Sequence, residues 1–82
     1  MENPIQMYGA DWCPDCRRAK RFFQEHGIAY DWHDTDSDPE AAEFVRKANG
    51  GRRVIPTILF PDGSLLVEPS NIELAAKTGV EL

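Results

Sequence analysis

Residues 10–23 read ADWCPDCRRAKRFF and contain the only two cysteines of the chain, Cys13 and Cys16. They stand where the apolar run PIQMY at residues 4–8 gives way to a segment with helical spacing. Pro14 suits the first position of a helix, so Cys13 precedes the helix as its N-cap. Unpaired N–H groups and the positive end of the helix dipole stabilise a thiolate there. The spacing therefore predicts a reactive thiolate at Cys13 and a second thiol, Cys16, one turn later.

Two thiols at this spacing can act in sequence. A thiolate at Cys13 can attack a disulfide, and Cys16 can then release the mixed disulfide that results. If Cys16 faces the core, burial raises its pKa, so we expect it to keep its proton until Cys13 has reacted. Arg17, Arg18 and Lys20 bring positive charge to the same helix, which favours the thiolate of Cys13.

Length and composition indicate one small globular domain. The chain has 82 residues, of which 41% are hydrophobic and 28% charged, so we expect a single domain over residues 1–82. The net charge of −5 argues against broad binding to nucleic acid or anionic membranes. No run reaches the roughly 20 apolar residues of a membrane span, and the first residues lack a signal-peptide pattern. We therefore expect a cytoplasmic monomer.

Apolar periodicity predicts the first half of the fold. A strand over residues 4–8 precedes a helix over 14–26, which Gly27 ends. Alternating residues then predict a second strand over 28–33. Because a helical crossover joins the two strands, we expect them to be parallel neighbours.

An acidic segment introduces the second predicted helix. Ser37 or Asp38 can serve as its N-cap, with Pro39 at the helix start and Glu40 placed for a capping box with Ser37. The apolar positions that follow have helical spacing, and the glycine pair at 50–51 ends the helix.

The last part of the chain predicts a hairpin and a third helix. Strands over 56–60 and 64–68 flank a short connection of Pro, Asp and Gly, which is typical of a β-hairpin. Ser70 and Glu73 then form a capping-box pattern for a helix that ends near Gly79. The predicted order is β-α-β-α-β-β-α.

This order, with CPDC after the first strand and VIPT before the hairpin, resembles the thioredoxin fold in its minimal, glutaredoxin-like form. The implied fold class is α/β, with helices around a four-stranded mixed sheet. The strings WCPDC, NGGRRVIPT and FPDGSLLVEPS are most similar to mycoredoxins and related glutaredoxin-like proteins of bacteria. The resemblance covers essentially the whole chain.

The resemblance implies a thiol-disulfide oxidoreductase with Cys13 and Cys16 as its catalytic residues. Its substrates would be protein disulfides, or mixed disulfides between a protein and a small thiol. Mycothiol or glutathione would be the reducing cosubstrate, recycled by an NADPH-dependent reductase, or thioredoxin reductase would act directly. No bound cofactor and no metal site are expected.

The resemblance also implies a substrate-binding region opposite the cysteines. It places a cis bond before Pro56, where the backbone of Ile55 pairs with the substrate as an added strand would. We expect Trp12 to be partly exposed and to contact partners. The candidate substrate-binding residues are Trp12, Pro14, Arg53, Val54, Ile55, Pro56, Ser70 and Asn71.

Several residues bear on the choice of thiol. Common glutaredoxins carry a lysine near the position of Asp11 and an aromatic residue at that of Asp15. Arg52 and Arg53 can receive a carboxylate of a thiol cosubstrate or of an acidic partner, or can simply be solvated.

The start of the last helix also bears on this choice. Ser70 and Asn71 match the place where glutaredoxins bind the γ-glutamyl carboxylate. Glu68 and Pro69 replace the Gly-Gly pair found there, so Ser70 serves equally well as an N-cap alone.

A second interpretation is a metal or iron-sulfur module, because a C-x-x-C pair is half of such a site. A zinc site within one chain would need His26 and His33 as ligands. Both lie on elements expected to point away from the helix start, so the redox interpretation is favoured. A cluster shared between two subunits stays open.

Overall fold

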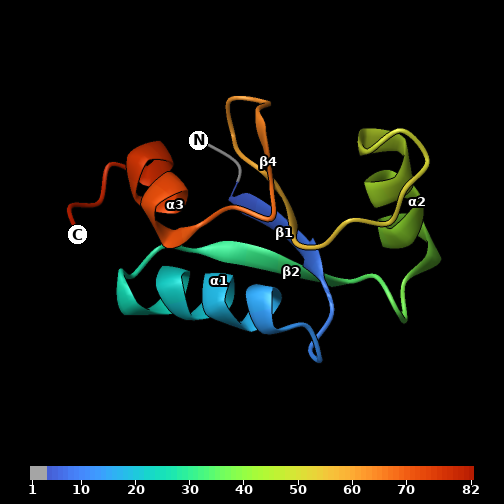
Figure 1. The fold of residues 1–82 in the computed structure, drawn as a ribbon, viewed down its shortest axis with the longest axis horizontal. Helices are drawn as coiled ribbons and strands as arrows, with labels where there is room; N and C mark the ends of the chain where they lie inside the picture. Colours follow the sequence, from blue (N-terminus) through green and yellow to red (C-terminus); the bar gives the residue numbers. More distant parts are fainter. Residues whose placement is uncertain (1–3) are drawn as a thin grey trace.

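The computed structural model describes residues 4–82 and has the predicted order of elements (Figure 1). The ends of the predicted strands and helices differ from the observed ones by only one or two residues. None of the helices in this part of the chain is long and apolar enough to cross a membrane. The elements are β1 (Ile5–Gly9), α1 (Pro14–Glu25), β2 (Tyr30–Asp34), α2 (Pro39–Ala48), β3 (Thr57–Leu59), β4 (Leu65–Val67) and α3 (Asn71–Thr78).

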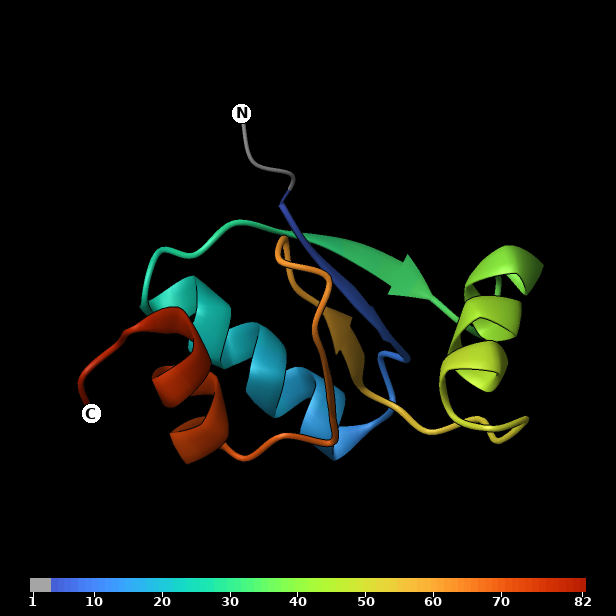
Figure 2. The same cartoon turned by 90° about the horizontal axis from the view of Figure 1, so that it is seen from above.

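The four strands form one mixed sheet in the order β2-β1-β3-β4. β1 is parallel to β2, as the helical crossover predicted, and antiparallel to β3. β3 and β4 form the predicted antiparallel hairpin. Figure 2 shows α1 and α3 on one side of the sheet and α2 on the other. The carboxyl end of β1 leads through the loop of residues 10–13 into the start of α1, where the cysteines lie.

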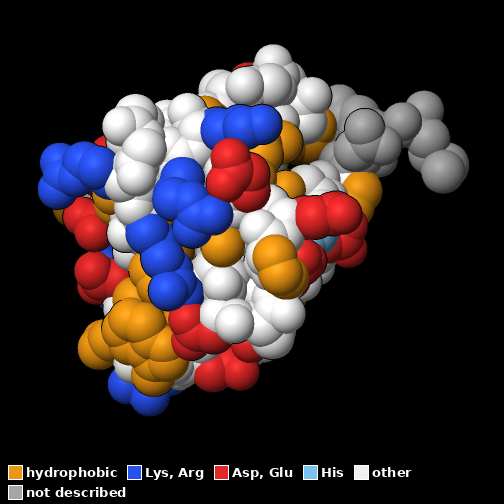
Figure 3. All heavy atoms as spheres, turned by 90° about the vertical axis from the view of Figure 1, so that its right-hand side faces the viewer, with side chains coloured by type: hydrophobic (Ala, Val, Ile, Leu, Met, Phe, Trp, Pro, Cys, Tyr) orange, Lys and Arg blue, Asp and Glu red, His pale blue; other side chains and the backbone are white. Residues whose placement is uncertain are grey.

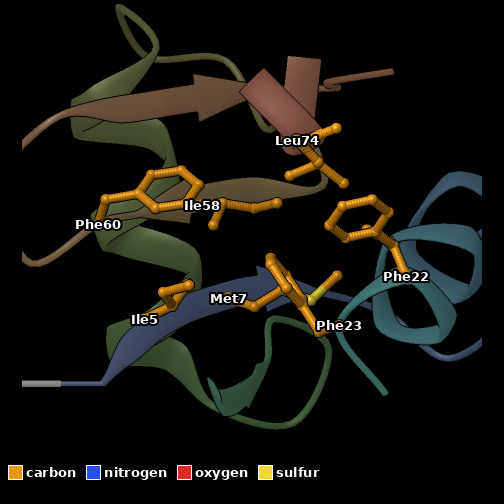
Figure 4. Packing of buried hydrophobic residues seen from close by; sticks show 9 residues of the cluster. Ile5, Met7, Phe22, Phe23, Ile58, Phe60 and Leu74 are labelled. Atoms are coloured by element: carbon orange, nitrogen blue, oxygen red, sulfur yellow. The ribbon is translucent and has the colours of Figure 1, made fainter. Parts of the chain in front are cut away.

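The core lies between the sheet and the pair α1 and α3 (Figure 4). Alternate residues of β1 are buried on this side, and the two phenylalanines of α1 and Leu74 of α3 pack against them. Burial of each large apolar side chain stabilises the fold by about 1.5–3 kcal/mol. This packing holds α1 and α3 against the sheet. The labelled core residues are Ile5, Met7, Phe22, Phe23, Ile58, Phe60 and Leu74.

An aromatic stack occupies the other side of the sheet. The Tyr8 ring lies 4.5 Å from the His33 ring and 4.4 Å from the Phe44 ring, centroid to centroid. Phe44, on α2, is half-buried in this stack. Tyr8 alternates with buried Met7 along β1, so the second face of the strand supports α2.

Side-chain caps define where α2 and α3 begin. Asp38, not Ser37, caps α2: its carboxylate accepts hydrogen bonds from the N–H groups of Glu40 and Ala41. Of the two candidates for this cap, Asp38 is adjacent to Pro39, the first helical residue, so its carboxylate reaches the free N–H groups. The predicted capping box of α3 forms between Ser70 and Glu73.

Candidate active site

Cys13 is the N-cap of α1, as the sequence predicted. Its backbone is extended, with φ −78° and ψ 119°, and Pro14 takes the first helical position. The Cys13 N–H donates to the Ala10 carbonyl at 3.2 Å, and the Cys13 carbonyl accepts from the Arg17 N–H at 3.0 Å. These bonds close the loop between β1 and α1 and start the helix. The side chain is 7% exposed, so its thiol lies just beneath the surface.

Cys16 is one turn further along α1 and is fully buried. A Cβ atom built at Gly9 would lie only 2.5 Å from the Cys16 sulfur, so the thiol packs directly on the backbone of β1. Burial raises the pKa of Cys16 to about 12, although a backbone hydrogen bond with Ala10 opposes the shift. A hydrogen bond with Cys13 raises the pKa further. Both cysteines are free thiols in this structure.

The two thiols therefore differ in environment. Cys13 stands at the N-terminal end of α1 and is 7% exposed, whereas Cys16 lies wholly beneath the surface. Cys16 is buried and holds its proton at neutral pH, and it is hydrogen-bonded to Cys13. A pair of this kind can supply one sulfur for attack while the other stays protonated nearby.

The segment before β3 contains a cis peptide bond between Ile55 and Pro56. Pro56 is buried, and its carbonyl accepts a hydrogen bond from the Glu68 N–H at 2.9 Å. The Val54 carbonyl accepts from the Thr57 hydroxyl at 2.7 Å. Within the described part of the chain, no backbone group pairs with the N–H or carbonyl of Ile55. The half-buried Ile55 therefore keeps its main-chain groups available to an added strand.

Trp12, Asp36 and Arg53 form a connected group, here called the Asp36 bridge. Trp12 is 63% exposed, and its indole N–H donates to Asp36 Oδ2 at 2.6 Å. The Arg53 guanidinium donates to Asp36 Oδ1 and forms an ion pair with it. Hydrogen bonds from Arg53 and Trp12 hold the pKa of Asp36 below its ordinary value. The bridge joins the loop before Cys13 to the segment before the cis proline.

Thr35 anchors this bridge to the sheet. Its hydroxyl accepts from Arg53 at 2.8 Å and donates to the Gly9 carbonyl at 3.1 Å. The Thr35 N–H also donates to that carbonyl, at 2.9 Å. In the sequence, Thr35 and Asp36 stand out only as part of the acidic segment that leads to α2. The feature that could have placed them at the site is their position directly after β2, because the carboxyl ends of neighbouring parallel strands meet at one edge of the sheet.

The start of α3 is closed by internal contacts. The Ser70 N–H donates to the Glu73 carboxylate at 3.0 Å, and the Glu73 N–H donates to the Ser70 hydroxyl at 3.1 Å. The Arg18 guanidinium donates to the Pro69 carbonyl at 3.1 Å and to the Asn71 side-chain oxygen at 3.5 Å. Ser70 thus acts as an N-cap, and a carboxylate of the protein itself occupies the helix start.

Two of the cations expected to support Cys13 have carboxylate partners. Arg18 forms an ion pair with Asp15 at 3.3 Å. Lys20 pairs with Asp11 at 3.2 Å, and its ammonium lies 3.8 Å from the centre of the Trp32 ring. Their charge is therefore partly balanced where sequence spacing suggested free cations. Both carboxylates stay largely exposed, at 75% for Asp11 and 55% for Asp15.

Neither histidine joins the cysteines. His26 packs against Phe22 at the end of α1, with 4.6 Å between ring centres. His33 contacts Gln6 through Nε2 at 2.6 Å and stacks on Tyr8. Within residues 4–82, no three His, Cys, Asp or Glu side chains are grouped so that they could hold a metal ion.

Solved structures with the same architecture belong to the thioredoxin-like fold. A mutant of a thioredoxin-like protein superimposes with a TM-score of 0.84 and 23% identity, covering 96% of this chain and 99% of that one. The glutaredoxin of Methanosarcina mazei superimposes with a TM-score of 0.78 and 26% identity, covering 94% and 79%. The predicted fold class is thereby confirmed.

Sequence similarity assigns the chain to one family within this fold. The family model described as Glutaredoxin matches residues 5–66. A Mycobacterium tuberculosis protein that bears a glutaredoxin name is 44% identical over 73 residues, covering 89% of this chain and 87% of that protein. Mycoredoxin 1 of Corynebacterium glutamicum is 38% identical over 73 residues, covering 89% and 90%. The chain belongs to the glutaredoxin family, a family of thiol-disulfide oxidoreductases.

Proposed function

We propose that this protein reduces disulfides through Cys13 and Cys16 acting in two steps. The Cys13 thiolate attacks one sulfur of the substrate disulfide, so a mixed disulfide forms and the other sulfur leaves as a thiolate. Cys16 then loses its proton and attacks the Cys13 sulfur. The second substrate thiolate leaves, and the Cys13–Cys16 disulfide holds the two oxidising equivalents taken from the substrate.

The observation that carries this proposal is the difference between the two thiols. Cys13 caps a helix close to the surface, while burial raises the pKa of Cys16 to about 12. An attacking thiol has to be ionised and accessible, whereas a resolving thiol works best if it stays protonated until the mixed disulfide has formed.

The segment 54–56 is the proposed docking site for the substrate backbone. The unpaired main-chain groups of Ile55 support pairing with the residues around the substrate cysteine, by addition of a strand. Trp12 adds an exposed aromatic surface next to Cys13, and half-buried Val54 adds an apolar one. Main-chain pairing does not depend on substrate sequence, so we expect the protein to accept several protein disulfides.

The proposed reducing cosubstrate is a small thiol without carboxylates, as mycothiol is. Both places at which the sequence suggested binding of a glutathione carboxylate already hold a carboxylate of this protein. Asp36 pairs with Arg53, and Glu73 bonds to the N–H of Ser70 at the start of α3. A second carboxylate at either place would meet like charge. The similarity to mycoredoxin 1 supports the same choice.

A coupled assay of NADPH consumption tests the function and the cosubstrate together. Its three arms are mycothiol with its reductase, glutathione with its reductase, and thioredoxin reductase alone, each with a protein mixed disulfide of the same thiol or a protein disulfide. We expect the mycothiol arm to be fastest. Cys13→Ser should abolish turnover in every arm, and full activity of that variant would refute the mechanism.

Cys16→Ser separates the two steps. It should retain turnover of small-thiol mixed disulfides, because a second thiol molecule can resolve them. It should lose the reduction of protein disulfides, in which no external thiol reaches the intermediate. Equal loss of both activities would show that Cys16 is needed for attack and would contradict its assignment to resolution.

A further inference from the structure

The Asp36 bridge joins two segments of the site by means of one carboxylate. Trp12 binds Oδ2 and Arg53 binds Oδ1, so each oxygen serves a different segment. Trp12 precedes Cys13 in the chain, and Arg53 lies two residues before Ile55. A single side chain from the turn after β2 therefore touches both the loop before Cys13 and the segment before the cis proline.

The bridge lies at the rim of the site, where ligands can reach it. The side chains of Arg53 and Asp36 are 39% and 42% exposed. Figure 3, which views the molecule from the α2 side, shows Lys and Arg side chains next to Asp and Glu side chains. An arginine at such a place would bind a carboxylate of an incoming thiol if its own partner were absent.

We propose that Asp36 is a specificity-determining residue that also positions Trp12, an inference that rests on the proposed function. Its carboxylate neutralises Arg53, so the site offers no free cation there to a carboxylate-bearing thiol. The same carboxylate holds the indole of Trp12 beside Cys13. Asp36 itself takes no part in the exchange of disulfides.

Asp36→Asn separates charge from shape. The amide keeps an oxygen that can accept from the indole N–H, but it no longer carries the charge that balances Arg53. The freed guanidinium then attracts a carboxylate of the substrate thiol. For one solvent-exposed ion pair we expect a gain on the order of threefold for a carboxylate-bearing thiol relative to a neutral one.

The test is a single-turnover comparison of two substrates. Pre-reduced protein is mixed with one peptide carrying its cysteine either as a mixed disulfide with glutathione or as one with β-mercaptoethanol. The measured quantity is the ratio of the two second-order rate constants. Asp36→Asn should raise this ratio in favour of glutathione, and an unchanged or lowered ratio would overturn the assignment of specificity.

Two further variants locate the effect. Asp36→Asn combined with Arg53→Gln should return the ratio to the wild-type value, because no cation is then exposed. Asp62→Asn removes another exposed carboxylate, one that pairs with Lys77 at 2.6 Å, with the same change in net charge. It should leave the ratio unchanged, and a rise in this control would assign the effect to overall charge and refute the role of Asp36.

The positioning of Trp12 has its own readout. In a Trp32→Phe background, Trp12 is the only tryptophan, so its emission reports on the indole environment. Asp36→Ala should shift that emission toward solvent, while Asp36→Asn should not. Identical spectra for all three proteins would refute the positioning role. Wild-type protein that reacts with neither peptide would instead refute the proposed function, which keeps the two failures distinct.

Discussion

The sulfur of Cys16 lies against the backbone of Gly9. A Cβ atom at Gly9 would lie 2.5 Å from Cys16 Sγ and 3.1 Å from the ring of Trp32. Real side chains do not approach so closely, so the last residue of β1 has to lack one. The absence of a side chain at Gly9 is what makes room for a second thiol beneath the first turn of α1.

Gly9→Ala should therefore destabilise the protein by displacing Cys16. We expect the free energy of unfolding to fall by about 1–3 kcal/mol, the usual cost of overpacking a core. Urea denaturation monitored by circular dichroism measures this change. The contact predicts a smaller loss when Gly9→Ala is made in a Cys16→Ala background, since the sulfur that clashes is gone. Equal losses in both backgrounds would show that the Cys16 sulfur is not the cause of the destabilisation.

The raised pKa of Cys16 predicts a loss of stability at alkaline pH. Below the ordinary thiol value of about 9, both folded and unfolded chains keep the proton, so the contribution is constant. Between that value and about 12, the unfolded chain releases the proton while the folded chain retains it. Stability then falls as pH rises, by at most about 1.4 kcal/mol per pH unit for one group.

Unfolding in urea between pH 7.5 and 10 checks this slope. Burial and the neighbouring Asp38 also raise the pKa of Tyr8 above its ordinary value of 10, so near pH 10 this group adds a slope of the same sign, and it does so in both proteins compared. Cys16→Ala should flatten the profile relative to wild type, even though its overall stability differs. Parallel profiles for the two proteins would show that Cys16 does not cause the loss of stability at alkaline pH.

Ser70→Ala tests whether the start of α3 is structural. Loss of the capping box should lower the free energy of unfolding by about 1 kcal/mol. Because Glu73 already occupies this helix start, reaction with the glutathione and β-mercaptoethanol mixed disulfides should change by the same factor. A selective loss with glutathione would instead place Ser70 in recognition of the thiol. Ser37→Ala, in the exposed turn before α2, serves as the matched control for stability.

Local patterns were sufficient to predict the order of the helices and strands, while the four-stranded mixed sheet was implied by the resemblance to glutaredoxin-like proteins. The run from β1 into α1, the turn between β3 and β4, and the capping box at Ser70 each depend on neighbouring residues. Chain order then fixed the parallel pairing of β1 with β2. The position of Cys13 at the helix start followed in the same way from Pro14.

The contacts around the site were harder to predict, because they join residues far apart in the chain. Asp36 meets Trp12 across 24 positions and Arg53 across 17. Arg18 reaches Pro69 across 51 positions. No periodicity or motif links such pairs, so Arg53 resembled a free cation and Asp36 resembled part of an acidic segment.

Two-step exchange is tested most sharply by the mass of Cys16→Ser protein after brief exposure to a peptide–glutathione mixed disulfide. Two-step exchange predicts that this variant accumulates a mixed disulfide on Cys13, located by peptide mapping. Cys13→Ser should stay unmodified, and wild type should carry an internal disulfide between Cys13 and Cys16. An adduct that forms on Cys16 in the Cys13→Ser variant at a comparable rate would contradict the assignment of Cys13 as the attacking thiol.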